Sequence, residues 1–110
     1  MSQKMEDTGS QMNSISMKIY KVGNDVLIAA CDAELLGKTL RNDDIEFRVS
    51  EKFYKDIIGD EELLKKNLSL ATIGNLLGEK CVKCAIEMGL VEPENVIRID
   101  EIPHAQFVII

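Results

Sequence analysis

The sequence predicts an α+β fold: a mostly antiparallel or mixed sheet of about five strands, with one long helix packed on it and two short helices. Strand-like segments stand before and after a block of helical segments, so strands and helices are segregated along the chain. Between Ser69 and Gly89, apolar residues recur at the three- and four-residue spacing of one helix face. A length of 110 residues, 45% of them hydrophobic, suits a single domain.

The first 16 residues have a composition of their own. They are rich in Ser, Gln, Met and acidic residues, and they contain no aromatic residue and no periodic pattern. Such a segment cannot bury enough apolar surface to fold. We therefore expect residues 1–16 to form a disordered tail and residues 17–110 to form one α+β domain.

A β-hairpin opens the predicted domain. Residues 17–22 are of the strand-forming type, and residues 26–31 form the returning strand. Gly23 and Asn24 suit a two-residue turn between them, because both tolerate positive φ. Every residue from 26 to 31 is apolar, which indicates a central strand covered on both faces.

The segment that follows is predicted to be compact. Asp32 suits the N-cap of a single turn, residues 33–36, which Gly37 closes. A turn at residues 42–44 then leads to residues 45–49, where apolar and charged side chains alternate. That alternation is typical of a half-buried strand.

Two short helices are predicted next. Ser50 caps the first, over residues 51–58, and Asp60 caps the second, over residues 61–67. The second helix has acidic residues in its first turn and lysines in its last, which matches the helix dipole.

The long helix, about residues 69–88, is the predicted organiser of the fold. Ser69 caps its start, and Gly89 ends it as a left-handed cap. A glycine inside a helix costs about 1 kcal/mol relative to alanine. Gly74 and Gly78 therefore indicate close approach of another backbone, from the sheet or from a second chain, and the oligomeric state stays open.

His104, the only histidine, is predicted to lie in a bend at residues 102–104, between strands over residues 96–100 and 105–110. Glu101 is near enough in sequence to orient it. A histidine there can be structural, can bind a ligand, or can act as a general base with a cysteine or serine nucleophile.

The composition limits the classes of partner and the location that can be expected for the protein. A formal net charge of -6 argues against broad binding to nucleic acid, and no DNA binding is predicted. No run of 18 apolar residues is present, so no membrane span is expected, and the start lacks a signal-peptide core. The expected compartment is the cytoplasm, where the three cysteines are reduced by default.

Gly37, Lys38 and Thr39 look like the end of a phosphate-binding loop. That loop needs a glycine where this chain has Asp32, a carboxylate that would repel phosphate, so no nucleotide-binding loop is predicted. The segment is interpreted as a solvated turn or as part of a small basic patch. The patch would contain Lys38, Arg41 and Arg48.

Cys81 and Cys84 form a Cys-x-x-Cys pair. Their spacing is that of the apolar helix face, so they are interpreted as core residues. The alternative is a structural zinc site with Cys31 and His104. No metal and no cofactor are predicted.

Four blocks resemble the archaeal domain-of-unknown-function family 424. They are 17–27 (MKIYKVGNDVL), 31–38 (CDAELLGK), 71–79 (ATIGNLLGE), and 95–99 (NVIRI) with 103–106 (PHAQ). The resemblance implies a small archaeal cytoplasmic α+β protein without an assigned activity. It also implies an association with translation genes, and hence RNA or the translation machinery as a partner.

The sequence thus favours a non-catalytic binding or interaction module. The alternative is a small enzyme or ligand-binding protein with its site at His104 and the 32–41 loop, and the third hypothesis is a structural zinc protein. The candidate ligand-binding residues are His104, Gln106, Asp32, Glu34, Lys38 and Arg41.

Overall fold

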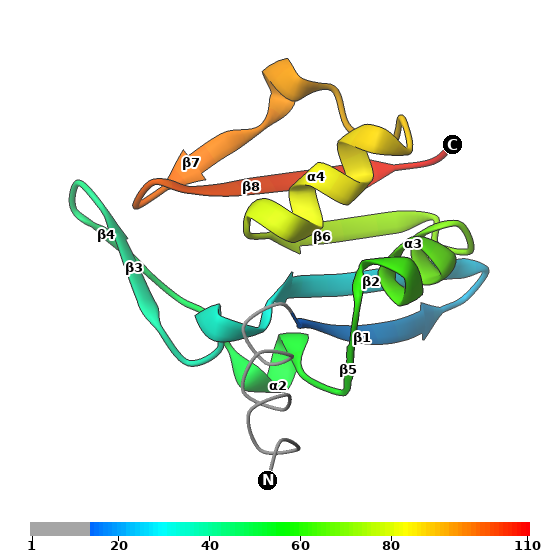
Figure 1. Ribbon diagram of the computed structural model, residues 1–110, viewed down its shortest axis with the longest axis horizontal. Coiled ribbons are helices and arrows are strands. Elements are labelled where there is room, and N and C mark those ends of the chain that lie inside the picture. Colours follow the sequence, from blue (N-terminus) through cyan, green and yellow to red (C-terminus); the bar gives the residue numbers. More distant parts are fainter. Residues whose placement is uncertain (1–13) are drawn as a thin grey trace, which may run out of the picture.

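The computed structural model describes residues 14–110 and has an α+β architecture (Figure 1). Its main sheet is mixed and contains six strands in the order β5-β1-β2-β6-β8-β7, where about five were expected. These strands are β1 (Ile15–Val22), β2 (Asp25–Asp32), β5 (Ile57–Gly59), β6 (Ile73–Leu77), β7 (Ile97–Ile99) and β8 (Ile102–Val108). The predicted tail falls largely on residues 1–13, which lie outside the described residues.

A second sheet of two antiparallel strands projects from one end of the main sheet (Figure 1). It consists of β3 (Thr39–Asn42) and β4 (Ile45–Arg48). The turn between them was predicted, but β3 was not predicted as a strand. Three α-helices complete the described fold: α2 (Glu51–Tyr54), α3 (Glu61–Leu68) and α4 (Glu79–Glu87), with 3-10 turns η1 (Ala33–Leu35) and η2 (Pro93–Asn95).

The first hairpin is confirmed. β1 and β2 pair antiparallel along their whole length, from Ile15 opposite Asp32 to Val22 opposite Asp25. β2 is central, as its apolar run predicted, and its inner neighbour β6 runs parallel to it. The sheet is therefore mixed, because this one parallel pair sits among antiparallel pairs.

The prediction of one long helix over residues 69–88 is wrong. Its first half is β6, which lies between β2 and β8 in the sheet, and only residues 79–87 form the helix α4. Gly74 explains part of the difference, since a Cβ there would lie 2.1 Å from the Phe107 ring. The chain then turns directly from β6 into α4 at Gly78, whose φ of 114° suits glycine.

The structure also differs from the predicted ends of other helices and strands. The helix predicted over residues 51–58 ends at Tyr54, because the chain then pairs with β1 as strand β5. The bend predicted at residues 102–104 is part of β8. The caps were predicted correctly: the Ser50 and Asp60 side chains accept hydrogen bonds from the N–H groups of Phe53 and Leu63.

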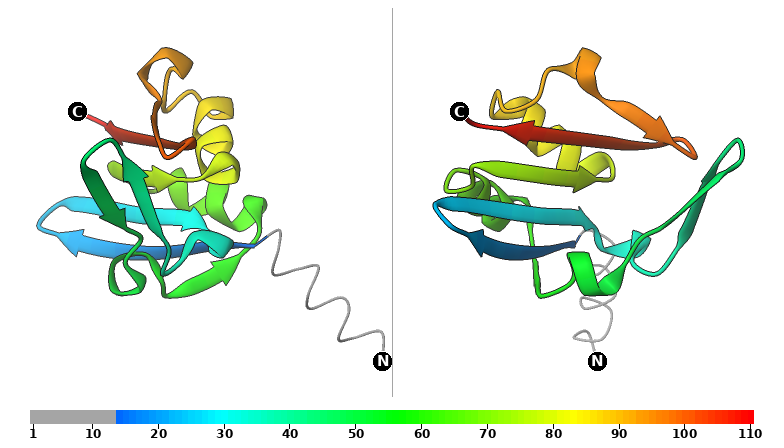
Figure 2. Two further views of the ribbon diagram at one scale, coloured as in Figure 1. Left: turned by 90° about the vertical axis from the view of Figure 1, so that its left-hand side faces the viewer. Right: turned by 180° about the vertical axis from the view of Figure 1, so that it is seen from behind.

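Apolar clusters lie on both faces of the main sheet. α3 and α4 cover one face, which we call the helical face, with Ile28, Leu64 and Leu76 in its core. The β3–β4 hairpin, η1 and α2 cover one end of the other, which we call the hairpin face and which Figure 2 shows from behind. Among residues 14–110, no helix is long and apolar enough to span a membrane.

Candidate functional site

The structure distributes the six predicted site residues over three places. His104 and Gln106 lie on the hairpin face of β8 and line a pocket there. Asp32 and Glu34 lie near the start of α4. Lys38 and Arg41 belong to the hairpin segment. The predicted joint site of His104 with the 32–41 loop is therefore divided, because none of its loop residues lines the His104 pocket.

The pocket of about 250 Å³ lies where the hairpin and α2 meet the main sheet, as its lining residues show. We call it the sheet-face pocket. It is lined by Phe47, Arg48, Ser50, Phe53, Tyr54, Asn75, His104 and Gln106. These residues come from β4, α2, β6 and β8, so segments distant in sequence build it together.

Strand pairing places the polar groups of the pocket side by side. In the β6–β8 register, Asn75 stands opposite Gln106, and Leu77 stands opposite His104. Opposed residues have Cβ atoms about 5 Å apart and point to the same face. Residues two apart on a strand also share a face. Asn75, Gln106 and His104 thus form a triangle of hydrogen-bonding side chains on the hairpin face.

Most of these groups lack a partner inside the protein. Within the described chain, the side chains of His104, Gln106 and Arg48 have no hydrogen bond or ion pair. The Asn75 Oδ1 accepts a hydrogen bond of 2.8 Å from the Tyr54 hydroxyl, which leaves the amide N–H groups free. Burial lowers the pKa of His104 from its ordinary 6.5, so its imidazole is neutral at pH 7.

Aromatic rings surround the same pocket. Phe53 stacks on Tyr20 with ring centres 5.6 Å apart, and its ring meets Tyr54 edge-on at 4.9 Å. The Tyr20 hydroxyl donates a 2.8 Å hydrogen bond to the Phe53 carbonyl, which ties α2 to the sheet. The ammonium of Lys18 lies 5.3 Å from the centre of the Tyr20 ring. This wall is rigid, because each ring is packed against another.

Asp32 has a structural role that its predicted cap position did not reveal. Its side chain makes no bond to the turn η1. Instead its oxygens accept hydrogen bonds of 3.1 Å from the backbone N–H groups of Lys80 and Cys81, at the start of α4. Desolvation of this buried carboxyl raises its pKa, while those hydrogen bonds act in the opposite direction. The carboxylate therefore occupies the N-terminus of α4.

Lys80 links Asp32 to Glu34. Its ammonium lies 3.9 Å from an Asp32 oxygen and 3.4 Å from a Glu34 oxygen. The three charges satisfy one another near the start of the helix. The cluster thus has a structural role at the start of α4, with two carboxylates sharing one ammonium.

The predicted basic patch is also divided. The Arg41 guanidinium forms an ion pair with Glu46 across the β3–β4 hairpin, and the backbone N–H of Arg41 donates a 3.1 Å hydrogen bond to the Asp100 carboxylate. Lys38 is exposed just before β3. Of the three basic residues, only Arg48 lines the sheet-face pocket.

The cysteines are core residues, as their spacing indicated. Cys81 and Cys84 are buried in the core of the helical face, and Cys31 is buried in the core of the hairpin face. Burial raises the pKa of Cys31 to about 12. Among residues 14–110, no group of three or more His, Cys, Asp or Glu side chains is placed to hold a metal ion. The zinc hypothesis therefore has no support in the structure.

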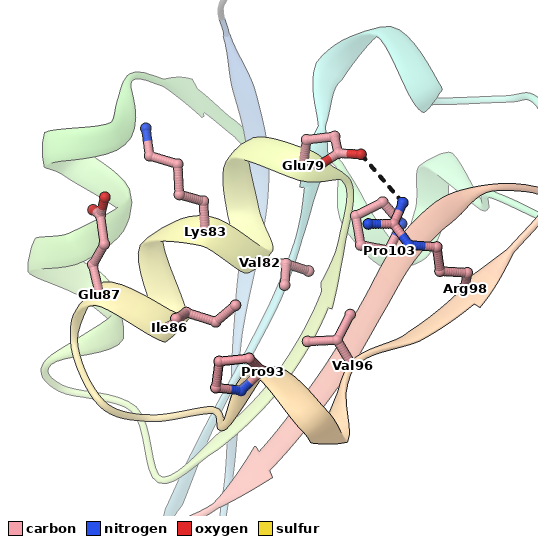
Figure 3. Close-up of a pocket in the computed structure, with 9 residues that line it drawn as sticks. All are labelled: Glu79, Val82, Lys83, Ile86, Glu87, Pro93, Val96, Arg98 and Pro103. Carbon is pink, nitrogen blue, oxygen red and sulfur yellow. Dashed lines mark hydrogen bonds and ion pairs between the residues drawn. The ribbon is translucent and has the colours of Figure 1, made fainter.

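A second hollow lies between α4 and the segment from η2 to β8 (Figure 3). We call it the α4 groove. It has a volume of about 300 Å³ and is lined by Glu79, Val82, Lys83, Ile86, Glu87, Pro93, Val96, Arg98 and Pro103. Its floor is apolar, and its four charged side chains all form ion pairs within the protein: Glu79 with Arg98, Lys83 with Glu61 and Glu87 with Lys65.

Sequence reasoning did not identify five residues of the sheet-face pocket as site residues: Asn75, Tyr54, Phe53, Phe47 and Ser50, which was predicted only as a helix cap. Of these residues, Asn75 had the clearest signal in the sequence, since an amide in the apolar run of residues 73–77 is unusual for a central strand. The helix prediction concealed that signal, because a helix has a polar side on which an asparagine is ordinary.

Comparisons with known proteins agree with the fold. The chain is similar to an uncharacterized conserved protein from Methanopyrus kandleri of known structure, with a TM-score of 0.80 and 24% identity, over 88% of this chain and 92% of that chain. At that identity the likeness bears on the fold alone. No curated protein matches the chain. The family model described as "Protein of unknown function (DUF424)" matches residues 20–110, and the chain therefore belongs to the family DUF424.

Proposed function

We propose that this protein is a non-catalytic binding module whose ligand occupies the sheet-face pocket. The single observation that carries the proposal is the set of polar side chains there without a partner in the described chain: His104, Gln106 and Arg48, with the free N–H groups of Asn75. His104 and Asn75 are partly buried, whereas Gln106 and Arg48 are exposed, and all four line the pocket within reach of a ligand.

The chemistry of the lining supports binding over catalysis. No carboxylate and no cysteine line the pocket, so His104 has no partner there that would orient it as a base. Its one serine, Ser50, already accepts a hydrogen bond from the Phe53 N–H as a helix cap. Cys31, the nucleophile considered from the sequence, is fully buried. An enzyme at His104 therefore lacks the second group it would need.

The lining also limits the kind of ligand. Rigid aromatic rings favour a flat ligand, and the neutral amide and imidazole groups favour one with hydrogen-bonding atoms along its edge. Arg48 favours a negative charge. RNA or the translation machinery, and a cytoplasmic location, stay predictions from the sequence.

Two matched probes test this proposal: nicotinate, which is flat and anionic, and nicotinamide, which has nearly the same shape and is neutral. Titration at millimolar concentration, followed by NMR of the His104 ring and the Asn75 and Gln106 amides, should shift these signals with both probes. The substitution Arg48→Gln should weaken the binding of nicotinate and leave the binding of nicotinamide unchanged. Arg98→Gln in the α4 groove is the matched control and should change neither. Absence of shifts in the pocket, or shifts along α4 instead, would overturn the proposal.

A further inference from the structure

The geometry of the sheet-face pocket points to a more specific ligand: we propose that it holds one nucleobase of an RNA nucleotide, with the attached phosphate beside Arg48. This inference rests on the function proposed above and names the chemical class of its ligand. Four features of the pocket carry it, namely size, hydrogen-bonding pattern, aromatic wall and charge.

The size of the pocket limits it to one ring system. Its volume of about 250 Å³ lies just below the range of roughly 300–1,000 Å³ that is usual for sites of drug-sized ligands. A single base with part of its sugar is a ligand of that class. The pocket is also partly open, so a chain attached to the base can leave along the sheet.

The hydrogen-bonding groups match the edge of a base. Asn75 and Gln106 are direct cross-strand neighbours, and His104 lies two residues from Gln106 on the same face. The Tyr54 hydroxyl fixes the Asn75 amide so that its N–H groups face outward as donors. Gln106 and neutral His104 each offer both a donor and an acceptor. Such a mixture suits a base edge, where donors and acceptors alternate within one plane.

The aromatic wall supplies a flat surface. Phe47 from β4 and Phe53 from α2 line the pocket and are partly exposed, whereas the Tyr54 ring is buried and contributes its hydroxyl group. Stacking of a base on an aromatic ring is worth about 1–3 kcal/mol and tolerates any base. Recognition of unpaired bases on a sheet by aromatic rings and polar side chains is the usual way in which proteins bind single-stranded RNA.

The pocket has one positive charge, which favours an anionic ligand. Arg48 is its only charged side chain at pH 7, since His104 is neutral. A phosphate diester carries one negative charge, whereas a terminal phosphate carries about 1.5 to 2. Because the protein has a net charge of -6, it repels the more highly charged terminal phosphate more strongly, and this favours a nucleotide inside a strand. The protein as a whole, at -6, would repel a long strand beyond this local contact.

The test uses a panel of small compounds on the full chain, followed by the same NMR signals and by tyrosine fluorescence, to which Tyr20 and Tyr54 both contribute. The panel contains the four nucleoside 5′-monophosphates, the dinucleotides UpU and ApA, ribose 5-phosphate without a base, and uridine without a phosphate. We expect the tightest binding from a dinucleotide, about tenfold weaker binding without the phosphate, and at least about tenfold weaker binding without the base.

Substitutions assign the contacts. Gln106→Ala should weaken the binding of the nucleotides about fivefold and leave the binding of ribose 5-phosphate unchanged, since Gln106 would contact only the base. Arg48→Gln should weaken the binding of every probe that carries a phosphate and leave the binding of uridine unchanged. Asn95→Ala, exposed in η2, is the control for the amide, and Arg98→Gln is the control for the arginine.

The two proposals fail in distinguishable ways. If ribose 5-phosphate binds as tightly as the nucleotides, or if none of them binds while nicotinate and nicotinamide still shift His104, then the nucleobase assignment is wrong and the binding module stands. If neither panel shifts the pocket signals, both are wrong. A dinucleotide that binds no better than a free monophosphate would overturn the assignment to a strand.

Discussion

The sheet-face pocket and the α4 groove have similar volumes and differ in what their polar groups do. In the α4 groove, each of the four charged side chains has an ion-pair partner in the same chain, and the floor is aliphatic. In the sheet-face pocket, His104, Gln106 and Arg48 have none among the described residues. The difference teaches that a hollow is a candidate site when its polar groups are left for a ligand.

The two regions also depend on different parts of the fold. The α4 groove is formed by α4 and the segment from η2 to β8, so it depends on how α4 is anchored. The sheet-face pocket depends on strand register, because β6 and β8 present its side chains directly. Substitutions that disturb α4 should therefore cost stability, whereas substitutions in the pocket should cost binding.

The largest effect is expected at Gly78, where β6 of the pocket passes into α4 of the groove. A Cβ at Gly78 would lie 2.4 Å from the Asp32 carboxyl carbon, on a backbone with φ of 114°. Gly78→Ala should lower the free energy of unfolding by about 3 kcal/mol, measured by urea denaturation. Gly89→Ala is the control, since it also has positive φ but open space around it, and should cost about 1 kcal/mol. Equal costs would show that the contact with Asp32 is wrong.

Asp32 comes next, because its carboxylate anchors α4 from the neighbouring strand. Asp32→Ala leaves the N–H groups of Lys80 and Cys81 without acceptors and should cost about 2 to 3 kcal/mol in thermal or urea unfolding. Asp32→Asn keeps one acceptor and should cost less than half as much. If the asparagine variant is as unstable as the alanine variant, the hydrogen bonds to α4 are not what holds the helix.

A matched pair of truncations compares the two hollows directly. Val82 in the α4 groove is 3% exposed, so Val82→Ala should lower the free energy of unfolding by about 2 kcal/mol and leave nicotinate binding unchanged. Gln106→Ala in the pocket should change unfolding by less than about 0.5 kcal/mol, because Gln106 is exposed and makes no side-chain bond in the described chain. If Val82→Ala instead weakened nicotinate binding and Gln106→Ala lowered the stability, the assignment of binding to the pocket and of a structural role to the groove would be wrong.

The smallest effect is expected from His104. Burial lowers its folded pKa below the ordinary 6.5, so the unfolded chain takes up the proton first as the pH falls. The contribution of His104 to stability is therefore present above pH 6.5 and is lost as the pH falls from 6.5 through the folded pKa. Unfolding of the wild type and of His104→Gln between pH 5 and 8 should show a weaker pH dependence in the variant. An identical dependence would place His104 in solvent.

Local signals allowed much of the chain to be predicted. The turn at Gly23 and Asn24, the apolar run of β2, the caps at Ser50 and Asp60 and the end of α4 near Gly89 all follow from neighbouring residues. His104 and Gln106, two of the predicted candidate residues, line the same pocket, and their role as ligand-binding residues stays a prediction. Their grouping with Asp32 and Glu34 was wrong, because the 32–41 segment turns toward α4 and the hairpin.

What the sequence by itself determined is the set of local elements, because capping, turn formation and apolar alternation act over a few residues. Only the tertiary structure decided between helix and strand for residues 73–77, since the same short apolar run satisfies both periodicities. Its neighbours β2 and β8 hydrogen-bond it as a strand, and the Phe107 ring fills the space that only Gly74 leaves. That decision brings Asn75 beside Gln106 and so creates the pocket, through pairings between segments that are far apart in sequence.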